Sequence, residues 1–166
     1  MNKISITSIL FFLVLPLNLP ACGSKSSNTP GDQPATATVK LMTQGTPSGS
    51  SIAGVEAVLH LPPGVSVKAT QNPPQTDTGV VAASGVAATA GANTIIGTYL
   101  ASSNTLTVLI PNATDFGVGE FATVTCDIAA GKTMTTSNAG VTNLSVWDIN
   151  GALVTGLTAS FSVTVN

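Results

Sequence analysis

The chain has 166 residues, of which 43% are hydrophobic and only 7% are charged, and its formal net charge is −2. It contains five lysines and no arginine, so it lacks the clustered cations that neutralise phosphates in nucleic-acid-binding proteins. The low charge also differs from the highly charged composition of disordered chains. We therefore expect a folded protein that binds no nucleic acid and whose surface consists mainly of hydroxyl groups and small side chains.

Residues 1–21 have the pattern of an export signal. Lys3 precedes a run that is almost entirely apolar from Ile4 to Leu17. A membrane-spanning helix needs about 20 apolar residues, and Pro16 and Asn18 interrupt this run before it reaches that length. The segment is therefore predicted to be a signal peptide that is removed, and the chain is predicted to be exported.

The end of the apolar run, "LPAC" at residues 19–22, resembles the lipobox of bacterial lipoproteins. The resemblance implies that the thiol of Cys22 is acylated and that cleavage leaves this cysteine as the new N-terminus. The alternative is an ordinary secretory signal followed by a cysteine by chance. Gly23 follows the cysteine where an aspartate would favour the inner membrane. By the same resemblance, we expect a lipid anchor at the outer membrane or cell surface of a Gram-negative bacterium.

Removal of residues 1–21 from the 166 leaves 145 residues, enough for one domain of ordinary size. Four lysines then face seven acidic residues, which gives a net charge of −3. Residues 22–35 comprise the expected lipidated cysteine and a Ser-, Gly- and Pro-rich stretch that is typical of a flexible tether. Residues 36–166 are predicted to form the single folded domain.

Alternation of apolar and polar residues recurs along residues 36–166 and is typical of half-buried strands. We expect strands within the ranges 36–43, 52–61, 65–69, 93–101, 104–112, 119–131, 141–154 and 156–165. Asn150-Gly151 is a tight-turn signal between two strand runs. Residues 71–77 are expected to be a loop, and residues 78–92 either a weak strand with a loop or one short helical turn. About nine short strands at this spacing predict an all-β, antiparallel β-sandwich.

Cys126 is the one cysteine that remains if Cys22 is acylated, so no internal disulfide is expected. The alternation places Cys126 in phase with three apolar residues, Ala122, Val124 and Ile128. A catalytic thiol would need a basic neighbour that lowers its pKa, and the chain has a single histidine. We therefore expect Cys126 to be a buried core residue that behaves as a small hydrophobic side chain.

The order of these segments resembles the cohesin domain and its carbohydrate-binding relatives, which are nine-stranded jelly-roll sandwiches. The matching positions lie in "GVGEFATVTCDIAAG" and "NLSVWDING": Gly119, Ala122, Val124, Ile128, Gly131, Leu144, Asp148, Asn150 and Gly151. The resemblance covers about residues 36–166. It implies a non-catalytic module, because cohesins bind dockerin modules across one sheet face in cellulose-degrading complexes. The related modules bind polysaccharide through planar strips of aromatic side chains.

Two candidate binding sites follow. A dockerin-like protein partner would bind an outer sheet face with the exposed residues of two strands, Glu56, Val58, His60, Phe121, Thr123 and Thr125. A polysaccharide would instead stack on Trp147 or Tyr99, although Trp147 could also lie at the edge of the core. A structural surface subunit without a ligand is the third possibility.

No residue pattern in the sequence points to catalysis or to a metal. Glu56 and His60 lie four positions apart on one strand face, about 13 Å between Cα atoms, which is too far for them to share one proton. No pair of His, Cys, Asp or Glu has the spacing of metal ligands. "DING" at residues 148–151 lacks the remaining acidic positions of a calcium loop. We expect no enzymatic activity, no cofactor and no metal.

Overall fold

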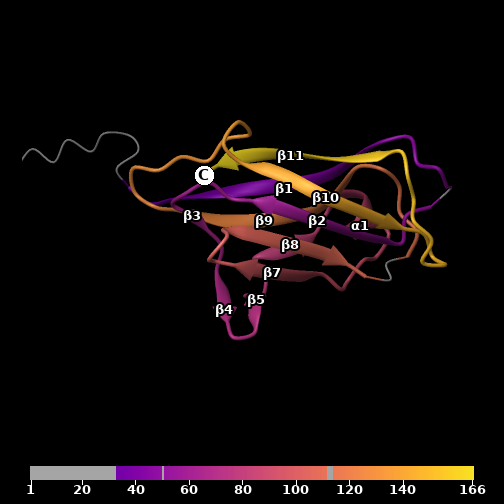
Figure 1. Ribbon diagram of the computed structural model, residues 1–166, viewed down its shortest axis with the longest axis horizontal. Helices are drawn as coiled ribbons and strands as arrows, with labels where there is room; N and C mark the ends of the chain where they lie inside the picture. Colours follow the sequence, from indigo (N-terminus) through magenta and orange to yellow (C-terminus); the bar gives the residue numbers. More distant parts are fainter. Residues whose placement is uncertain (1–32, 50, 112–113) are drawn as a thin grey trace, which may run out of the picture.

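The computed structural model describes residues 33–49, 51–111 and 114–166, which form an all-β fold of two antiparallel sheets packed face to face (Figure 1). The described residues contain eleven strands, more than the nine or so that were expected. Their bounds are β1 Ala35–Gly45, β2 Gly54–His60, β3 Val65–Ser66, β4 Ala69–Gln71, β5 Pro74–Thr76, β6 Val81–Ala83, β7 Ile96–Leu100, β8 Thr105–Ile110, β9 Glu120–Ile128, β10 Gly140–Trp147 and β11 Leu157–Val165. The expected signal peptide, Cys22 and most of the expected tether lie outside the described residues.

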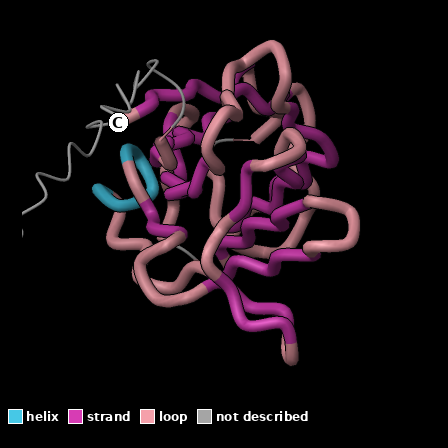
Figure 2. Tube along the Cα trace, turned by 90° about the vertical axis from the view of Figure 1, so that its left-hand side faces the viewer, coloured by secondary structure: helices cyan, strands magenta, loops and turns pink. Residues whose placement is uncertain are grey.

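The larger sheet has five strands in the order β11-β1-β9-β3, with β6 also paired to β9. The smaller sheet has four strands in the order β10-β2-β8-β7. β4 and β5 form a separate hairpin, which contacts β7 and projects from the sandwich in both views (Figures 1 and 2). The two edge strands β10 and β11 come into contact on one side of the sandwich. All pairings between strands are antiparallel, as the sequence predicts.

The core lies between the two sheets and is built from the apolar residues that alternate along each strand. In β1, Ala37, Val39 and Leu41 are fully buried. The same holds for the residues that β2 and β8 turn toward them, Val55, Ala57, Leu59, Leu106, Val108 and Ile110. The predicted inward faces of these three strands are therefore confirmed. Packed sheets lie about 10 Å apart, and side chains of this size fill that space.

Two segments without clear alternation form short elements. The prediction of a loop at residues 71–77 is wrong, because β4 and β5 pair there as a hairpin. Within this hairpin, Oγ1 of Thr70 donates a 2.9 Å hydrogen bond to the carbonyl oxygen of Pro73. Residues 78–92 contain β6 and the helix α1, Gly85–Thr89, so this segment combines a short strand with a helical turn. α1 is the one helix in the described part of the chain (Figure 2), and no helix there is long and apolar enough to cross a membrane.

Candidate functional site

The outer face of the four-stranded sheet carries three of the six residues that were predicted to bind a partner. Glu56, Val58 and His60 point away from the core, because the residues between them in β2 are fully buried. Nε2 of His60 lies 2.8 Å from Oγ1 of Thr142 in the neighbouring strand β10. The predicted outward direction of these three side chains is therefore confirmed.

The other three residues of the predicted binding face belong to the opposite sheet. β9 lies in the five-stranded sheet, so Thr123 and Thr125 point outward from the other side of the sandwich. Phe121 is fully buried, and the prediction that it is exposed is wrong. The six residues consequently do not form one surface, and a partner on either sheet could contact at most half of them.

A β-bulge accounts for the burial of Phe121. In the register between β1 and β9, Leu41 pairs with Ala122 and Met42 pairs with Glu120, so Phe121 has no partner in β1. An extra residue of this kind interrupts the alternation of the bulged strand. Phe121 and Ala122 are consequently both buried although they are neighbours in the chain. Alternation predicts the face of a residue only as far as the next bulge.

The outer face of the five-stranded sheet is rich in hydroxyl groups. Thr38 in β1 lies between Thr125 of β9 and Thr164 of β11. One ion pair crosses this face, with Nζ of Lys40 3.0 Å from Oε2 of Glu120. The hydrogen bond from Lys40 holds the pKa of Glu120 below its ordinary value. Because both side chains are partly exposed, the pair contributes little to stability.

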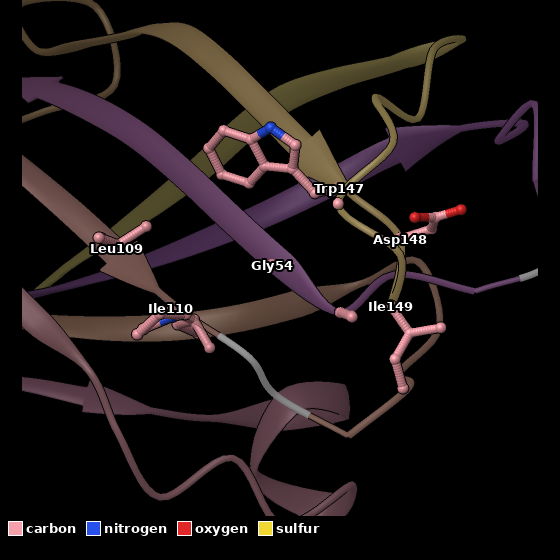
Figure 3. Close-up of a pocket in the computed structure, with 9 residues that line it drawn as sticks. Gly54, Leu109, Ile110, Trp147, Asp148 and Ile149 are labelled. Atoms are coloured by element: carbon pink, nitrogen blue, oxygen red, sulfur yellow. The ribbon is translucent and has the colours of Figure 1, made fainter.

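Trp147 lies at the end of β10, on the outer face of the four-stranded sheet. Its neighbour Val146 points into the core and is 2% exposed, whereas Trp147 is half-buried and turned outward. Trp147 pairs with Gly54 in β2, and the indole lies over that glycine (Figure 3). A Cβ atom on Gly54 would lie only 3.2 Å from Cε3 of the indole. Because Gly54 has no side chain, the indole ring can lie directly against the backbone of β2.

A pocket of about 420 Å³ opens beside this indole (Figure 3). Most of its lining is apolar and comes from three elements: β2, β8 and the turn after β10. The lining residues are Ala53, Gly54, Leu109, Ile110, Pro111, Trp147, Asp148, Ile149 and Gly151. Asp148 is the one ionisable side chain among them. The pocket thus suits an apolar group better than a charged one.

The turn after β10 forms the outer wall of the pocket, and it confirms the turn predicted at Asn150-Gly151. Oδ1 of Asp148 accepts hydrogen bonds of 2.8 Å from the backbone N–H groups of Asn150 and Ala152. Gly151 has a φ of 77°, which a glycine adopts without strain. Asp148 therefore holds the turn. Among the described residues, no group of three or more His, Cys, Asp or Glu side chains is placed to hold a metal ion.

The same turn exposes two large apolar side chains beside Trp147. Ile149 is 68% exposed, and Leu153, which pairs directly opposite Trp147, is 67% exposed. Together with Leu109 of β8, these residues form an apolar surface that we call the Trp147 patch: Leu109, Trp147, Ile149 and Leu153. Leu109, Ile149 and Leu153 were not among the residues predicted from the sequence. The available signal was a pair of large apolar residues around a tight turn, where polar residues are usual.

Tyr99 does not lie on this surface. Its side chain is 5% exposed, and its hydroxyl group donates a 2.6 Å hydrogen bond to Oδ1 of Asn104. Nδ2 of Asn104 in turn donates to three carbonyl oxygens of the segment after β2, those of Leu61, Pro62 and Val65. Burial raises the pKa of Tyr99. The prediction that Tyr99 could stack on a sugar is wrong, because its ring belongs to the core.

Cys126 is free and fully buried, so its predicted place in the core is confirmed. Burial raises the pKa of its thiol to about 12. Since the thiolate is the nucleophilic form of cysteine, the thiol is inert at neutral pH. Cys126 therefore belongs to the packing of β9.

No protein-family model, no curated protein and no solved structure matches this chain. The likeness of its sequence to cohesins stays a prediction.

The raised pKa of Cys126 predicts a loss of stability at alkaline pH. A thiol whose pKa is higher in the folded than in the unfolded chain favours folding below the unfolded value of about 9, and this contribution disappears as the pH rises toward 12. We expect the free energy of unfolding to fall more steeply above about pH 9 in the wild type than in Cys126→Ala, by at most about 1.4 kcal/mol per pH unit.

Denaturant titrations of both proteins at a series of pH values measure this difference. Burial raises the pKa of Tyr99 in both proteins, and Cys126 adds a smaller contribution to it, so the comparison includes this coupling between the two groups. Equal slopes in the two proteins would contradict the burial of a neutral thiol at position 126.

Proposed function

We propose that the chain is a non-catalytic, lipid-anchored recognition module that binds a protein partner through the outer face of its four-stranded sheet. The observation that carries the proposal is the Trp147 patch around an apolar pocket. Contiguous exposed apolar groups are uncommon on monomeric proteins and mark interaction sites. Tryptophans at the centre of such surfaces are frequent binding hot spots, because they bury a large area at a small cost in conformational entropy.

The charge of this face supports a partner with an uncharged surface. Among the residues that β2, β7, β8 and β10 turn outward, Glu56 and His60 are the only ionisable ones. The remaining outward residues of these described strands are threonines, one serine, one asparagine, glycines and apolar side chains. The cores of protein interfaces are similarly depleted in charged residues. A partner that presents apolar and uncharged polar side chains therefore complements the pocket beside Trp147, whose lining includes neither Glu56 nor His60.

The placement of the reactive side chains supports binding rather than catalysis. The thiol of Cys126 is buried with a raised pKa, and Nε2 of His60 is engaged by Thr142. Glu56 lies on the same strand as His60 with Val58 between them. A general acid and base must both reach the reacting atoms, and these two groups point outward in parallel from separate positions.

A polysaccharide is the second candidate ligand, and the outward orientation of Trp147 over Gly54 favours it. An indole in this position can act as a stacking platform for a sugar ring. The burial of Tyr99 removes the second platform that the sequence suggested. Ile149 and Leu153 offer no hydrogen bonds to sugar hydroxyl groups. We therefore rank the protein partner first.

The lipid anchor is part of the proposal and rests on the sequence around Cys22. Several acyl chains on one cysteine anchor a protein stably, since each buried methylene contributes about 0.8 kcal/mol. β1 begins at Ala35, so residues 22–34 would join the anchor to the sandwich. At a maximum of about 3.5 Å per residue, such a tether reaches roughly 45 Å from the membrane surface. The patch could then meet partners in the periplasm or at the cell surface.

Mass spectrometry of the protein isolated from its own cells tests the anchor. We expect residues 1–21 to be absent and Cys22 to carry lipid. A chain that is cleaved elsewhere, with an unmodified thiol at Cys22, would contradict the anchor and leave the binding face untouched.

The partner assay uses immobilised protein, a lysate of the same cells and, in parallel, retention on insoluble polysaccharides. We expect Trp147→Ala to weaken capture of a protein partner at least tenfold, because the substitution removes the centre of the patch. Leu153→Ser should weaken it less and without effect on folding, since this side chain is exposed. Thr125→Ala, on the outer face of the other sheet, is the matched control and should leave capture unchanged.

The opposite result is retention on a polysaccharide that Trp147→Ala abolishes, with no protein captured. It would mean that the ligand is a polysaccharide and that the proposal of a protein partner is wrong. The single tryptophan of the chain also gives a direct signal, because its fluorescence should change on binding only if Trp147 is in the interface.

A further inference from the structure

β11 forms a long edge of the five-stranded sheet, and on one side it comes into contact with the edge strand β10 of the other sheet (Figure 1). Among the described residues, β1 is the only strand that pairs with it, along all nine residues and without a bulge. Its sequence, "LTASFSVTV", contains no charge, no proline and no glycine. Proteins usually protect such an edge with a charge, a proline, a bulge or a covering segment, because a bare edge is a template for another strand.

The neighbouring edge strand β10 shows the protection that β11 lacks. The register between β10 and β2 shifts between Thr142 and Ser145. Within that interruption, Asn143 has a φ of 53°. A bulge with a left-handed residue twists an edge out of the plane that a further strand would need. Of the two edges on this side of the sandwich, β11 is therefore the one that can accept a strand.

The apolar layer of the five-stranded sheet is also left incomplete at β11. Its inward-facing residues are Leu157, Ala159, Phe161, Val163 and Val165. The first four are half-buried and Val165 is 54% exposed, whereas the β1 residues opposite the last three, Leu41, Val39 and Ala37, are fully buried. One more strand beside β11 would cover this apolar surface.

The backbone groups at this edge have a defined direction. The N–H of Asn166 donates a 2.8 Å hydrogen bond to the carbonyl oxygen of Thr36, which continues the register between β11 and β1. Hydrogen-bonded pairs alternate along an antiparallel ladder, so the even-numbered residues of β11 bond to β1. The odd-numbered residues, with Phe161 at their centre, turn their N–H and C=O groups to the free edge.

The sequence of β11 is nearly the same in both directions from Phe161. Ser160 matches Ser162, Thr158 matches Thr164, and small or branched apolar residues occupy the positions between them. We propose that β11 pairs antiparallel with β11 of a second copy of this chain, centred on Phe161 and related by a two-fold axis. Each hydroxyl side chain then faces a hydroxyl side chain, and each apolar side chain faces an apolar one, which are favourable cross-strand pairs.

The absence of charge in β11 and the composition of residues 23–34 favour a second copy of the chain over other strands at this edge. A strand without charge meets no repulsion when it pairs with itself. The chain's own residues 23–34, "GSKSSNTPGDQP", are rich in Gly, Ser and Pro and form strands poorly. The dimer leaves the outer face of the four-stranded sheet free, so it is independent of the proposed function. It would present two Trp147 patches to a partner with repeated sites and so raise its avidity.

Sedimentation of the full mature protein in density-matched detergent, over a range of concentrations, tests the proposal. We expect a dimer that dissociates on dilution. In the double variant Thr158→Lys and Thr164→Lys, each introduced lysine faces another lysine in the dimer, whereas both positions are exposed in the monomer. The dissociation constant of the dimer should rise about tenfold at low salt.

Two further variants make the test specific for this register. Thr158→Lys with Thr164→Glu places opposite charges in both pairs and should restore the dimer. Thr36→Lys with Thr125→Lys adds the same charge to exposed positions of the same sheet, away from the edge, and should leave the dissociation constant unchanged. A protein that is monomeric at every concentration would overturn the proposal, as would a dimer that all three variants weaken equally.

Discussion

Apolar side chains fill the space between the two sheets, and this packing determines which surfaces of the protein are left to bind a ligand. Side chains of Ala, Val, Leu and Ile alternate inward along β1, β2 and β8 and are completely removed from water. Close packing of this kind leaves recognition to the outer faces, the edges and the turns of the sandwich. The position of each strand in a sheet then determines which polar and apolar side chains share an outer surface.

The two outer faces differ because different strands contribute to them. The outer face of the five-stranded sheet carries threonines and serines and one ion pair, between Lys40 and Glu120. The four-stranded sheet carries Trp147 above Gly54, and the turn held by Asp148 adds two exposed apolar side chains. An aromatic ring, a glycine beneath it and a tight turn beside it together make the apolar pocket. We therefore propose this face, rather than the hydroxyl-rich one, as the binding surface.

Much of the fold was predictable from the sequence, because unbroken alternation fixes the inward face of a strand from its residues alone. β1, β2 and β8 satisfy that condition, and their faces were predicted correctly. Phe121 was not, since the bulge depends on how β9 pairs with a strand about 80 residues away. The separation of β2 and β9 into different sheets depends on such distant pairings too. The candidate binding surface was therefore predicted less well than the fold, because only the folded turn places Ile149 and Leu153 beside Trp147.

Hydroxyl-radical footprinting of the protein in its native cell envelope, compared with the purified protein, tests whether a partner covers the Trp147 patch on the outer face of the four-stranded sheet. We expect Trp147 and Leu153 to be oxidised less in the envelope, while Met42, on the outer face of the five-stranded sheet, is oxidised equally in both samples. Protection of Met42 together with unchanged oxidation of Trp147 would contradict the proposed binding surface.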